Sequence, residues 1–427
     1  MESINVRSDI KRLKKVIVHG PDPGIEWVTP SNAEVLLYDD IVFLPQMIEQ
    51  HKRFVAVLTA VLGPDAVIEF QSLLEDILNE RSVFEELLAV VIEFENVPLE
   101  QADYLRKLPA VSLAAVLISG VDPGLPQPVL PPLPNHIFTR DLGVTINDSF
   151  LTCIAGKTAR KRESILAWFV VHNHPLFSVS AGQSPRRRPG VNKNNNFIDL
   201  CEDSKNLLET LSDSRLAIEG GDVMVINEQN LFIGSSSRTN EYTIEKVANI
   251  LFEKGVVERV TLIEIPKLPT CIHLDTLFTQ ISSTDFIYYE PFMGGKLSIK
   301  QYRGSLDNMV RYQNLQDLVS ELQAGVRLIP CGNGRYPYQE REQYASGCNF
   351  VALKDGVAVS YARNLKTLEA LKEHGYQIIS AGELLNGVNT GLIQVEKLES
   401  TIITISSSEL TRAGGGPHCL TLPLVRR

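Results

Sequence analysis

The sequence has no long apolar run and nothing that resembles a membrane anchor. Its longest apolar stretches, such as 87–92 and 111–118, fall far short of the roughly 20 residues that a membrane helix needs. The first residues contain no basic segment followed by an apolar run, which is the pattern of a secretory signal. We therefore expect a cytoplasmic protein with no membrane partner.

The chain also lacks closely spaced cysteines. Its six cysteines are Cys153, Cys201, Cys271, Cys331, Cys348 and Cys419, and no two of them form a C-x-x-C pair. This scatter argues against a disulfide framework and against a zinc site. Reduced thiols are therefore expected, with no metal held by the cysteines.

There is no excess of basic residues. The chain has 51 acidic and 41 basic residues and a formal net charge of -10. An acidic balance without a basic stripe makes nucleic acid an unfavourable partner, whereas a small cationic substrate is compatible with it. The polar segment 184–196, which includes three consecutive arginines at 186–188, is predicted to be a solvated loop.

The sequence predicts an α/β protein in which strands and helices alternate, with one all-helical segment inserted. Residues 13–18 predict a strand that leads into a turn, and from about 69 to 122 leucines and alanines recur at helical spacing. Six prolines between 123 and 134 then predict an extended connector. Afterwards short apolar runs alternate with helical stretches. We predict a catalytic α/β domain over 1–68 and 123–427, with an inserted helical domain over 69–122.

Two short acidic segments carry residues suited to chemistry. His273 and Asp275 are two residues apart, so in an extended strand both side chains point to one face, where an imidazole can exchange protons beside a cation-binding carboxylate. In 219–222 two glycines permit a tight backbone path that brings acids near a ligand. On their own, a structural histidine and a turn with solvated acids are the commoner outcomes.

A cysteine near the end of the chain is a candidate nucleophile. Cys419 follows a glycine-rich stretch, where backbone amides and little side-chain bulk surround the sulfur. Asp141 ends an apparent strand far upstream. Taken singly, a buried structural thiol and an ordinary aspartate explain these two residues as well.

Together, these segments form one pattern that resembles arginine deiminase. The matching stretches, in order, are 135–141, 219–224, 273–276 and 418–423, with further likeness at 29–32, 36–40 and 347–349. The likeness runs nearly end to end, and the helical insert lies where arginine deiminases carry one. It implies the pentein fold, an α/β propeller of five units around a central site, decorated by the inserted α-helical domain.

The resemblance also implies roles for five catalytic residues. Asp141 and Asp275 would hold the substrate guanidinium, and Cys419 would attack its central carbon. His273 would protonate the departing ammonia and then activate water, while Glu219 would orient the imidazole. The implied reaction converts free L-arginine to L-citrulline and ammonia through a covalent amidino-cysteine. No cofactor is required, and a homo-oligomer is left open.

Three further positions match residues that recognise the carboxylate of free arginine: Asn135, Arg160 and Arg238. One position departs from the pattern. Many arginine deiminases carry an arginine where this chain has Gly414, which leaves substrate identity and gating open. The alternatives are an amidinotransferase, a hydrolase of another guanidino compound, or a catalytically silent pentein that acts as a binding protein.

Overall fold

The computed structural model describes residues 3–38, 40–177, 196–201 and 203–427. Asp39, which belongs to one of the matching stretches, and nearly all of the predicted polar loop 184–196 lie outside the described residues. Within the described ranges, no helix is both long enough and apolar enough to cross a membrane.

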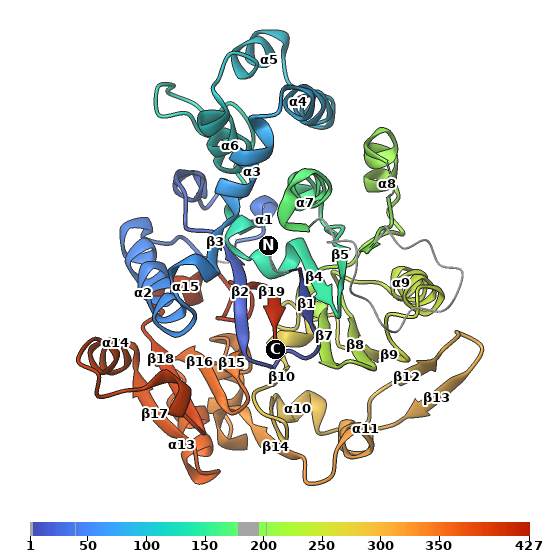
Figure 1. Cartoon of the computed structure of the whole chain (residues 1–427), viewed down its shortest axis with the longest axis vertical. Helices are drawn as coiled ribbons and strands as arrows, with labels where there is room; N and C mark the ends of the chain where they lie inside the picture. The colour runs from blue at the N-terminus through green and yellow to red at the C-terminus, as the bar shows by residue number, and fades with distance from the viewer. Residues whose placement is uncertain (1–2, 39, 178–195, 202) are drawn as a thin grey trace.

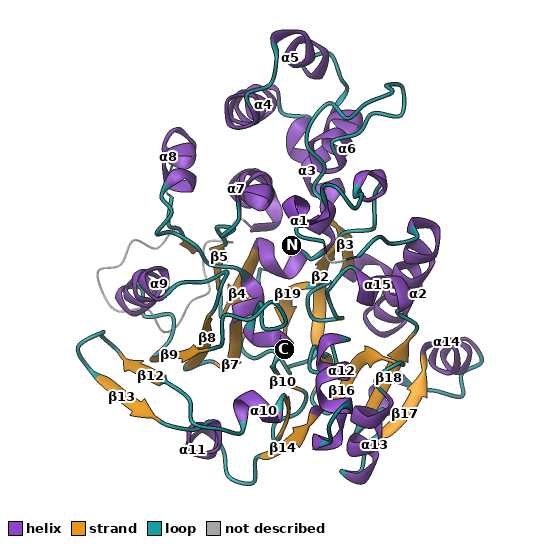
Figure 2. Cartoon of the chain, turned by 180° about the vertical axis from the view of Figure 1, so that it is seen from behind, coloured by secondary structure: helices purple, strands orange, loops and turns teal. Residues whose placement is uncertain are grey.

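The described residues form five small sheets (Figures 1 and 2). The first has the order β1 (Asn5–Val6), β19 (Leu422–Arg426), β2 (Leu13–Val18) and β3 (Val67–Glu69). The second contains β4 (Gly143–Ile146), β5 (Ser149–Thr152) and β6 (Phe197–Ile198). The third has the order β13 (Met309–Tyr312), β12 (Ile299–Arg303), β9 (Arg259–Glu264), β8 (Asn230–Ser235) and β7 (Val223–Asn227). The fourth contains β10 (Phe278–Gln280), β11 (Asp285–Tyr288) and β14 (Arg327–Pro330). The fifth has the order β15 (Val351–Lys354), β16 (Val357–Tyr361), β18 (Thr401–Ile405) and β17 (Gln377–Ser380).

The α-helices of the described residues lie mostly on the outside of these sheets, as Figure 1 shows. They are α1 (Ala33–Leu36), α2 (Leu44–Leu62), α3 (Phe70–Leu78), α4 (Arg81–Glu95), α5 (Leu99–Leu105), α6 (Ala110–Ser119), α7 (Lys161–Asn173), α8 (Leu207–Ser212), α9 (Glu241–Glu253), α10 (Glu290–Met293), α11 (Leu315–Leu322), α12 (Tyr338–Tyr344), α13 (Leu365–Glu373), α14 (Ala381–Asn389) and α15 (Ser408–Arg412).

Every sheet contains the same three-strand unit, an antiparallel pair whose second strand is joined by a parallel third strand. The units are β4-β5-β6, β7-β8-β9, β10-β11-β14, β15-β16-β18 and β19-β2-β3. In the last unit the strands come from both ends of the chain, because β19 pairs with β2. The units repeat a pattern of strand pairing and not a pattern of residues, which explains why no period is visible in the sequence.

The strands and helices of these units follow from their side chains. β18 has the sequence Thr-Ile-Ile-Thr-Ile and is buried throughout, as expected for a β-branched strand between two parallel neighbours. α9 begins where the Asn240 side chain accepts a hydrogen bond from the Thr243 amide. Its apolar face packs with the strands of the β7-β8-β9 unit through Ile244, Val247 and Leu251. This packing fixes the outer helix relative to the strands that approach the centre.

Helices α3 to α6 occupy the segment in which a helical insert was expected, and they extend away from the sheets in Figure 1. Their apolar residues share one core cluster with α7, as Leu74, Leu113 and Leu166 illustrate. The buried Arg162 on α7 reinforces this contact, since its Nε donates to the Leu117 carbonyl oxygen at 3.0 Å and its guanidinium pairs with Glu95. The helices are therefore anchored to the α/β part by a continuous core and a buried arginine.

A buried histidine connects the end of β2 to the end of β3. His19 Nδ1 lies 2.6 Å from Glu69 Oε1, and its Nε2 lies 3.4 Å from Asp22 Oδ2. Although burial opposes the charged form, the hydrogen bonds to Asp22 and Glu69 raise the pKa of His19 to about 9. Because this pKa exceeds the usual value, the stabilisation is fully present below about pH 6.5 and is lost as the pH rises through about 9.

We expect His19→Gln to lower the free energy of unfolding by about 1–3 kcal/mol at pH 6 and by much less at pH 10. Urea unfolding at both pH values measures the difference. His374→Gln is the matched control, because the His374 ring bonds a backbone carbonyl oxygen, that of Ala370, so its substitution removes no carboxylate–imidazole pair. Equal losses at the two pH values for His19→Gln would contradict the charged pairing.

Candidate functional site

The site forms where five turns meet, each placed directly before the first strand of one unit. These turns cover 139–142 before β4, 220–222 before β7, 274–276 before β10, 346–350 before β15 and 417–421 before β19. Contacts join neighbouring turns, since the 139–142 segment touches 220–222 and the latter touches 274–276. Segments far apart in the sequence therefore converge because equivalent strand beginnings point to one centre.

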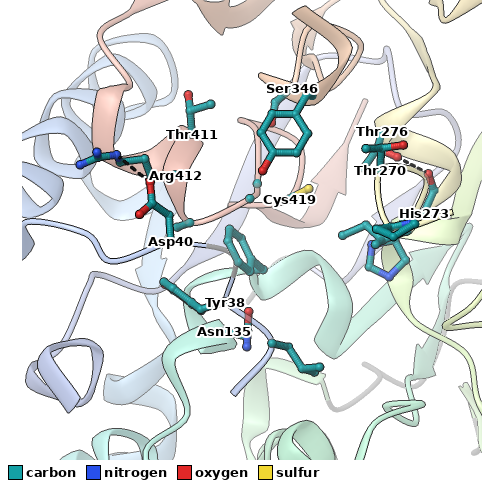
Figure 3. Close-up of a pocket in the computed structure, with 18 of the residues that line it drawn as sticks. Tyr38, Asp40, Asn135, Thr270, His273, Thr276, Ser346, Thr411, Arg412 and Cys419 are labelled. Carbon is teal, nitrogen blue, oxygen red and sulfur yellow. Dashed lines mark hydrogen bonds and ion pairs between the residues drawn. The ribbon is translucent and has the colours of Figure 1, made fainter. Parts of the chain in front are cut away.

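A cavity of about 750 Å³ opens at this convergence. Six of the residues predicted from the sequence line it: Asn135, Asp141, Arg160, Arg238, His273 and Cys419. Glu219 and Asp275, the other two, are completely buried and contact His273 and Cys419 respectively. Figure 3 shows Cys419, His273 and Asn135 around the cavity, with the Arg412–Asp40 ion pair at another wall.

His273 is held between two carboxylates. Its Nε2 lies 2.8 Å from Glu219 Oε2, and its Nδ1 lies 3.8 Å from Asp141 Oδ1. Burial lowers the pKa of His273, but the Asp141 charge and the hydrogen bond to Glu219 outweigh this effect and raise the pKa to about 10. The imidazole is therefore an imidazolium at neutral pH, ready to donate a proton.

A glycine makes this arrangement possible. The Gly221 amide donates to Asp141 Oδ1 at 3.0 Å, and a Cβ at Gly221 would lie 2.7 Å from His273 Nδ1. No larger residue fits there without displacing the imidazole. Asp222, the next residue, faces away from the cavity, accepting from the Leu274 amide at 2.9 Å and thereby tying the two turns together.

The guanidinium of Arg160 binds Asp141 and Glu219, the two carboxylates that also flank His273. Its Nη1 donates to Asp141 Oδ2 at 2.8 Å and to Glu219 Oε2 at 3.3 Å. Its Nε and Nη2 donate to the buried carboxylate of Glu163 at 3.1 and 2.8 Å. Although burial opposes ionisation, the Arg160 charge lowers the pKa of Glu219. The sequence predicted Arg160 as a site residue, but not its place on these two acids.

Cys419 lies beside a second carboxylate–imidazole pair. Its Sγ is 3.6 Å from Asp275 Oδ2, and the same oxygen is 2.8 Å from His418 Nδ1. Asp275 Oδ1 is buried and has no hydrogen-bond partner in the described part of the chain. Burial and the charges of Asp275 and Asp141 raise the pKa of the Cys419 thiol. A cation in the cavity would offset these negative charges and so favour the thiolate.

Asn135 and Arg238 lie on other walls of the cavity. Asn135 is anchored by a 2.7 Å hydrogen bond from its side chain to the Leu36 carbonyl oxygen. Arg238 follows β8, and its Nη1 lies 3.7 Å from Glu219 Oε2, farther than a direct hydrogen bond. Its guanidinium therefore has donors that an anionic group in the cavity can use.

The space around Gly414, the position at which the sequence departs from the expected pattern, is not filled by other atoms. Gly414 has a φ of +91°, in the left-handed region, and no atom lies within 4 Å of a Cβ built there. The neighbouring Arg412 lines the cavity but is paired with Asp40 at 3.1 Å. No side chain from position 414 therefore narrows the cavity.

Sequence reasoning missed His418 and Asn349 as members of the site. His418 belongs to one of the matching stretches but was given no role, yet it contacts Asp275 directly. Asn349 contacts the Cys419 sulfur. Asn349 could have been predicted from its position just before an apolar run, because the other four turns of the site also precede apolar runs.

Asp141, Glu219 and His273 also place three ligand atoms within 4.8 Å of one another, which is compatible with a metal ion. Both carboxylates already bind the Arg160 guanidinium, and His273 bonds Glu219. The geometry of this donor set thus suits a planar organic cation with several N–H groups.

The sequence model of the arginine deiminase family matches residues 125–196 and 208–426. Arginine deiminase of Bacillus cereus strain B4264 is 28% identical over 454 residues, covering 99% of this chain and 98% of that relative. Arginine deiminase of Limosilactobacillus fermentum is 29% identical over 451 residues, with the same coverage of both chains. Among solved structures, the amidinotransferase SxtG from Microseira wollei has a similar fold, with a TM-score of 0.50, 13% identity and coverage of 99% and 97%.

The fold and the site define a mixed α/β protein with a buried cysteine, histidine and carboxylate centre at the convergence of its sheets. The family match includes all five turns that build this centre. The chain belongs to the arginine deiminase family.

Proposed function

We propose that the protein hydrolyses the guanidinium of free L-arginine to L-citrulline and ammonia through a covalent intermediate on Cys419. The observation that carries this proposal is the Arg160 guanidinium on Asp141 and Glu219, beside His273, at 2.8 and 3.3 Å. It demonstrates that the two acids accommodate a guanidinium in a buried environment. The family's curated relatives bear the name arginine deiminase, which agrees with this chemistry.

The proposed reaction begins with exchange of one guanidinium for another. The substrate guanidinium takes the place of Arg160 Nη1 on Asp141 and donates to the unpartnered Asp275 Oδ1. Arg160 keeps its bonds to Glu163 through Nε and Nη2, and its freed Nη1 turns to the substrate carboxylate. Asn135 and Arg238 complete the recognition of the amino-acid end.

Bond making and breaking then follow from the charges of the site. The bound cation offsets the carboxylates that disfavour the thiolate, so the Cys419 thiol releases its proton to solvent and the thiolate attacks the central guanidinium carbon. The protonated His273 donates to the departing nitrogen, and the carbon–nitrogen bond breaks to release ammonia. Neutral His273 then takes a proton from water, whose oxygen attacks the same carbon and displaces the Cys419 sulfur.

Two features of the architecture belong to the same proposal. The five three-strand units, with their turns directed at one centre, are interpreted as the five blades of a pentein propeller. Residues 69–122 are proposed to be an inserted helical domain on a catalytic domain formed by 1–68 and 123–427. The helices α3 to α6 and their junction at α7 support this division.

The second candidate is a hydrolase of a different guanidino compound. Gly414 favours it, because the open space at this position leaves more room at the mouth of the cavity than an arginine side chain would. An amidinotransferase would use the same thiol, with an amine in place of water. Product identity separates the candidates.

We expect kcat/KM for L-arginine to exceed that for agmatine, which lacks the carboxylate, by at least about 100-fold, since a charge-assisted contact to Arg238 and Arg160 is lost. Parallel assays of ammonia release with the two substrates measure this ratio. Arg238→Gln is expected to reduce the ratio by lowering activity on L-arginine alone. Equal turnover of both compounds would contradict recognition of a free amino acid and would favour the second candidate.

A further inference from the structure

Four of the five central turns, with the residues directly before them, supply the carboxylates, the histidine and the cysteine of the proposed reaction, and the fifth supplies Asn349. This residue precedes β15 as Cys419 precedes β19. Its side chain is completely buried. It makes four hydrogen bonds, three of them to the turn that carries Cys419 and one to the Asp275 carbonyl oxygen.

The carboxamide of Asn349 contacts the nucleophile with both of its polar atoms. Oδ1 accepts from the amides of His418 and Cys419, at 3.0 and 3.2 Å. Nδ2 donates to the Cys419 sulfur at 3.2 Å and to the Asp275 carbonyl oxygen at 3.2 Å. A single side chain therefore fixes the backbone that carries the sulfur and directs an N–H group at the sulfur itself.

The glycine-rich stretch before Cys419 is shaped to this contact. A Cβ at Gly416 would lie 2.4 Å from Asn349 Oδ1, and a Cβ at Gly415 would lie 2.1 Å from the Phe138 ring. The Gly415 carbonyl oxygen accepts from the Tyr361 hydroxyl at 2.8 Å. The turn can approach Asn349 this closely only because Gly416 lacks a side chain, and Gly415 likewise leaves room for the Phe138 ring.

The charges around the sulfur explain why such a donor is needed. Asp275 Oδ2 lies 3.6 Å from Sγ, and the negative charges of Asp275 and Asp141 oppose the thiolate. A hydrogen bond to the charged form favours that form, and bonds to ions are stronger than bonds to neutral groups. Asn349 Nδ2 supplies an uncharged donor, so it stabilises the thiolate without repelling a cationic substrate.

We propose that Asn349 is a catalytic residue that stabilises the Cys419 thiolate through Nδ2, while its Oδ1 positions the turn that carries the nucleophile. The part of this inference that concerns turnover rests on the proposed function. The part that concerns the thiolate does not, because it follows from the contacts of Asn349 alone. The two parts can therefore be tested separately.

Asn349→Asp separates the two atoms of the carboxamide. An aspartate keeps an acceptor for the two backbone amides but replaces the N–H donor by a charged oxygen beside the sulfur. We expect the pH at which iodoacetamide alkylates Cys419 at half its maximal rate to rise by at least about one unit, since a tenfold change in the ionisation equilibrium corresponds to one unit. Mass spectrometry of the intact protein at a series of pH values follows the alkylation.

With L-arginine as substrate, Asn349→Asp is expected to lower kcat at least about 100-fold while KM changes less than threefold. Asn364→Ala is the control, because Asn364 is also a buried asparagine bonded to a backbone oxygen, that of Ala345, but does not contact the sulfur. Thermal unfolding of each variant establishes that it is folded.

An unchanged alkylation profile in folded Asn349→Asp would overturn the inference. If Asn349→Asp does not fold, Asn349→Ser carries the same test, because the shorter side chain removes the carboxamide donor without adding charge. If the unaltered protein fails to release citrulline, the proposed function is wrong, and the alkylation profile still decides the role of Asn349.

Discussion

Cys419→Ser is expected to lower citrulline formation at least about 10⁴-fold, because a serine hydroxyl beside two carboxylates cannot supply an anionic nucleophile. Asp275 already lies 3.6 Å from the sulfur, and the Asp275 and Asp141 charges raise even the thiol pKa. Binding of L-arginine should persist, since the carboxylates and Asn135 are unchanged. Steady-state assays of citrulline, with equilibrium binding of L-arginine to the variant, measure both effects.

Cys201→Ser is the matched control for this substitution. The Cys201 thiol is buried and donates to the Asp203 carbonyl oxygen at 3.1 Å, a bond that a hydroxyl can replace. Its activity should stay within about twofold of the unaltered protein. A Cys419→Ser protein that retains more than one-hundredth of the activity would exclude Cys419 as the nucleophile.

His273→Gln is expected to lower kcat at least about 10³-fold with little change in KM. The amide can still bond Glu219, but it can neither protonate the departing nitrogen nor take a proton from water. Because the acid form of His273 is required and its pKa is about 10, activity of the unaltered protein should fall as the pH rises through this value. The residual activity of His273→Gln should lack that fall.

pH–rate profiles of kcat/KM for both proteins test this assignment. His374→Gln serves again as the control, since His374 caps the C-terminus of α13 and lies outside the cavity lining. Its profile should coincide with that of the unaltered protein. An alkaline limb that survives unchanged in His273→Gln would assign the acid to another group.

The segments that meet at the candidate site were predictable because each combines reactive residues with a turn that local chemistry permits. Glu219 precedes two glycines, Cys419 follows three, and the order of the segments resembles the family to which the chain belongs. The segment of α3 to α6 was predictable from its helical spacing. These features depend on neighbours in sequence.

What the sequence could not reveal depends on pairing across long separations. The equivalence of the five units rests on hydrogen bonds between strands, such as β19 with β2, which no local pattern encodes. Arg160 was predicted to bind the substrate carboxylate, and the local sequence did not indicate that the fold buries it against Asp141, Glu219 and Glu163. Glu163 is a near neighbour in the sequence, but nothing near Arg160 in the sequence indicates that two acids from distant segments, Asp141 and Glu219, will also surround it.

The central claim is tested most directly by mass spectrometry of the products and of the acid-quenched protein after incubation with L-arginine, beside Cys419→Ala. The account predicts equal amounts of citrulline and ammonia. It also predicts a transient adduct on the peptide that contains Cys419, absent from the variant. Unconsumed L-arginine and no adduct on folded protein would contradict the account and direct the search to other guanidino compounds that the open space at Gly414 admits.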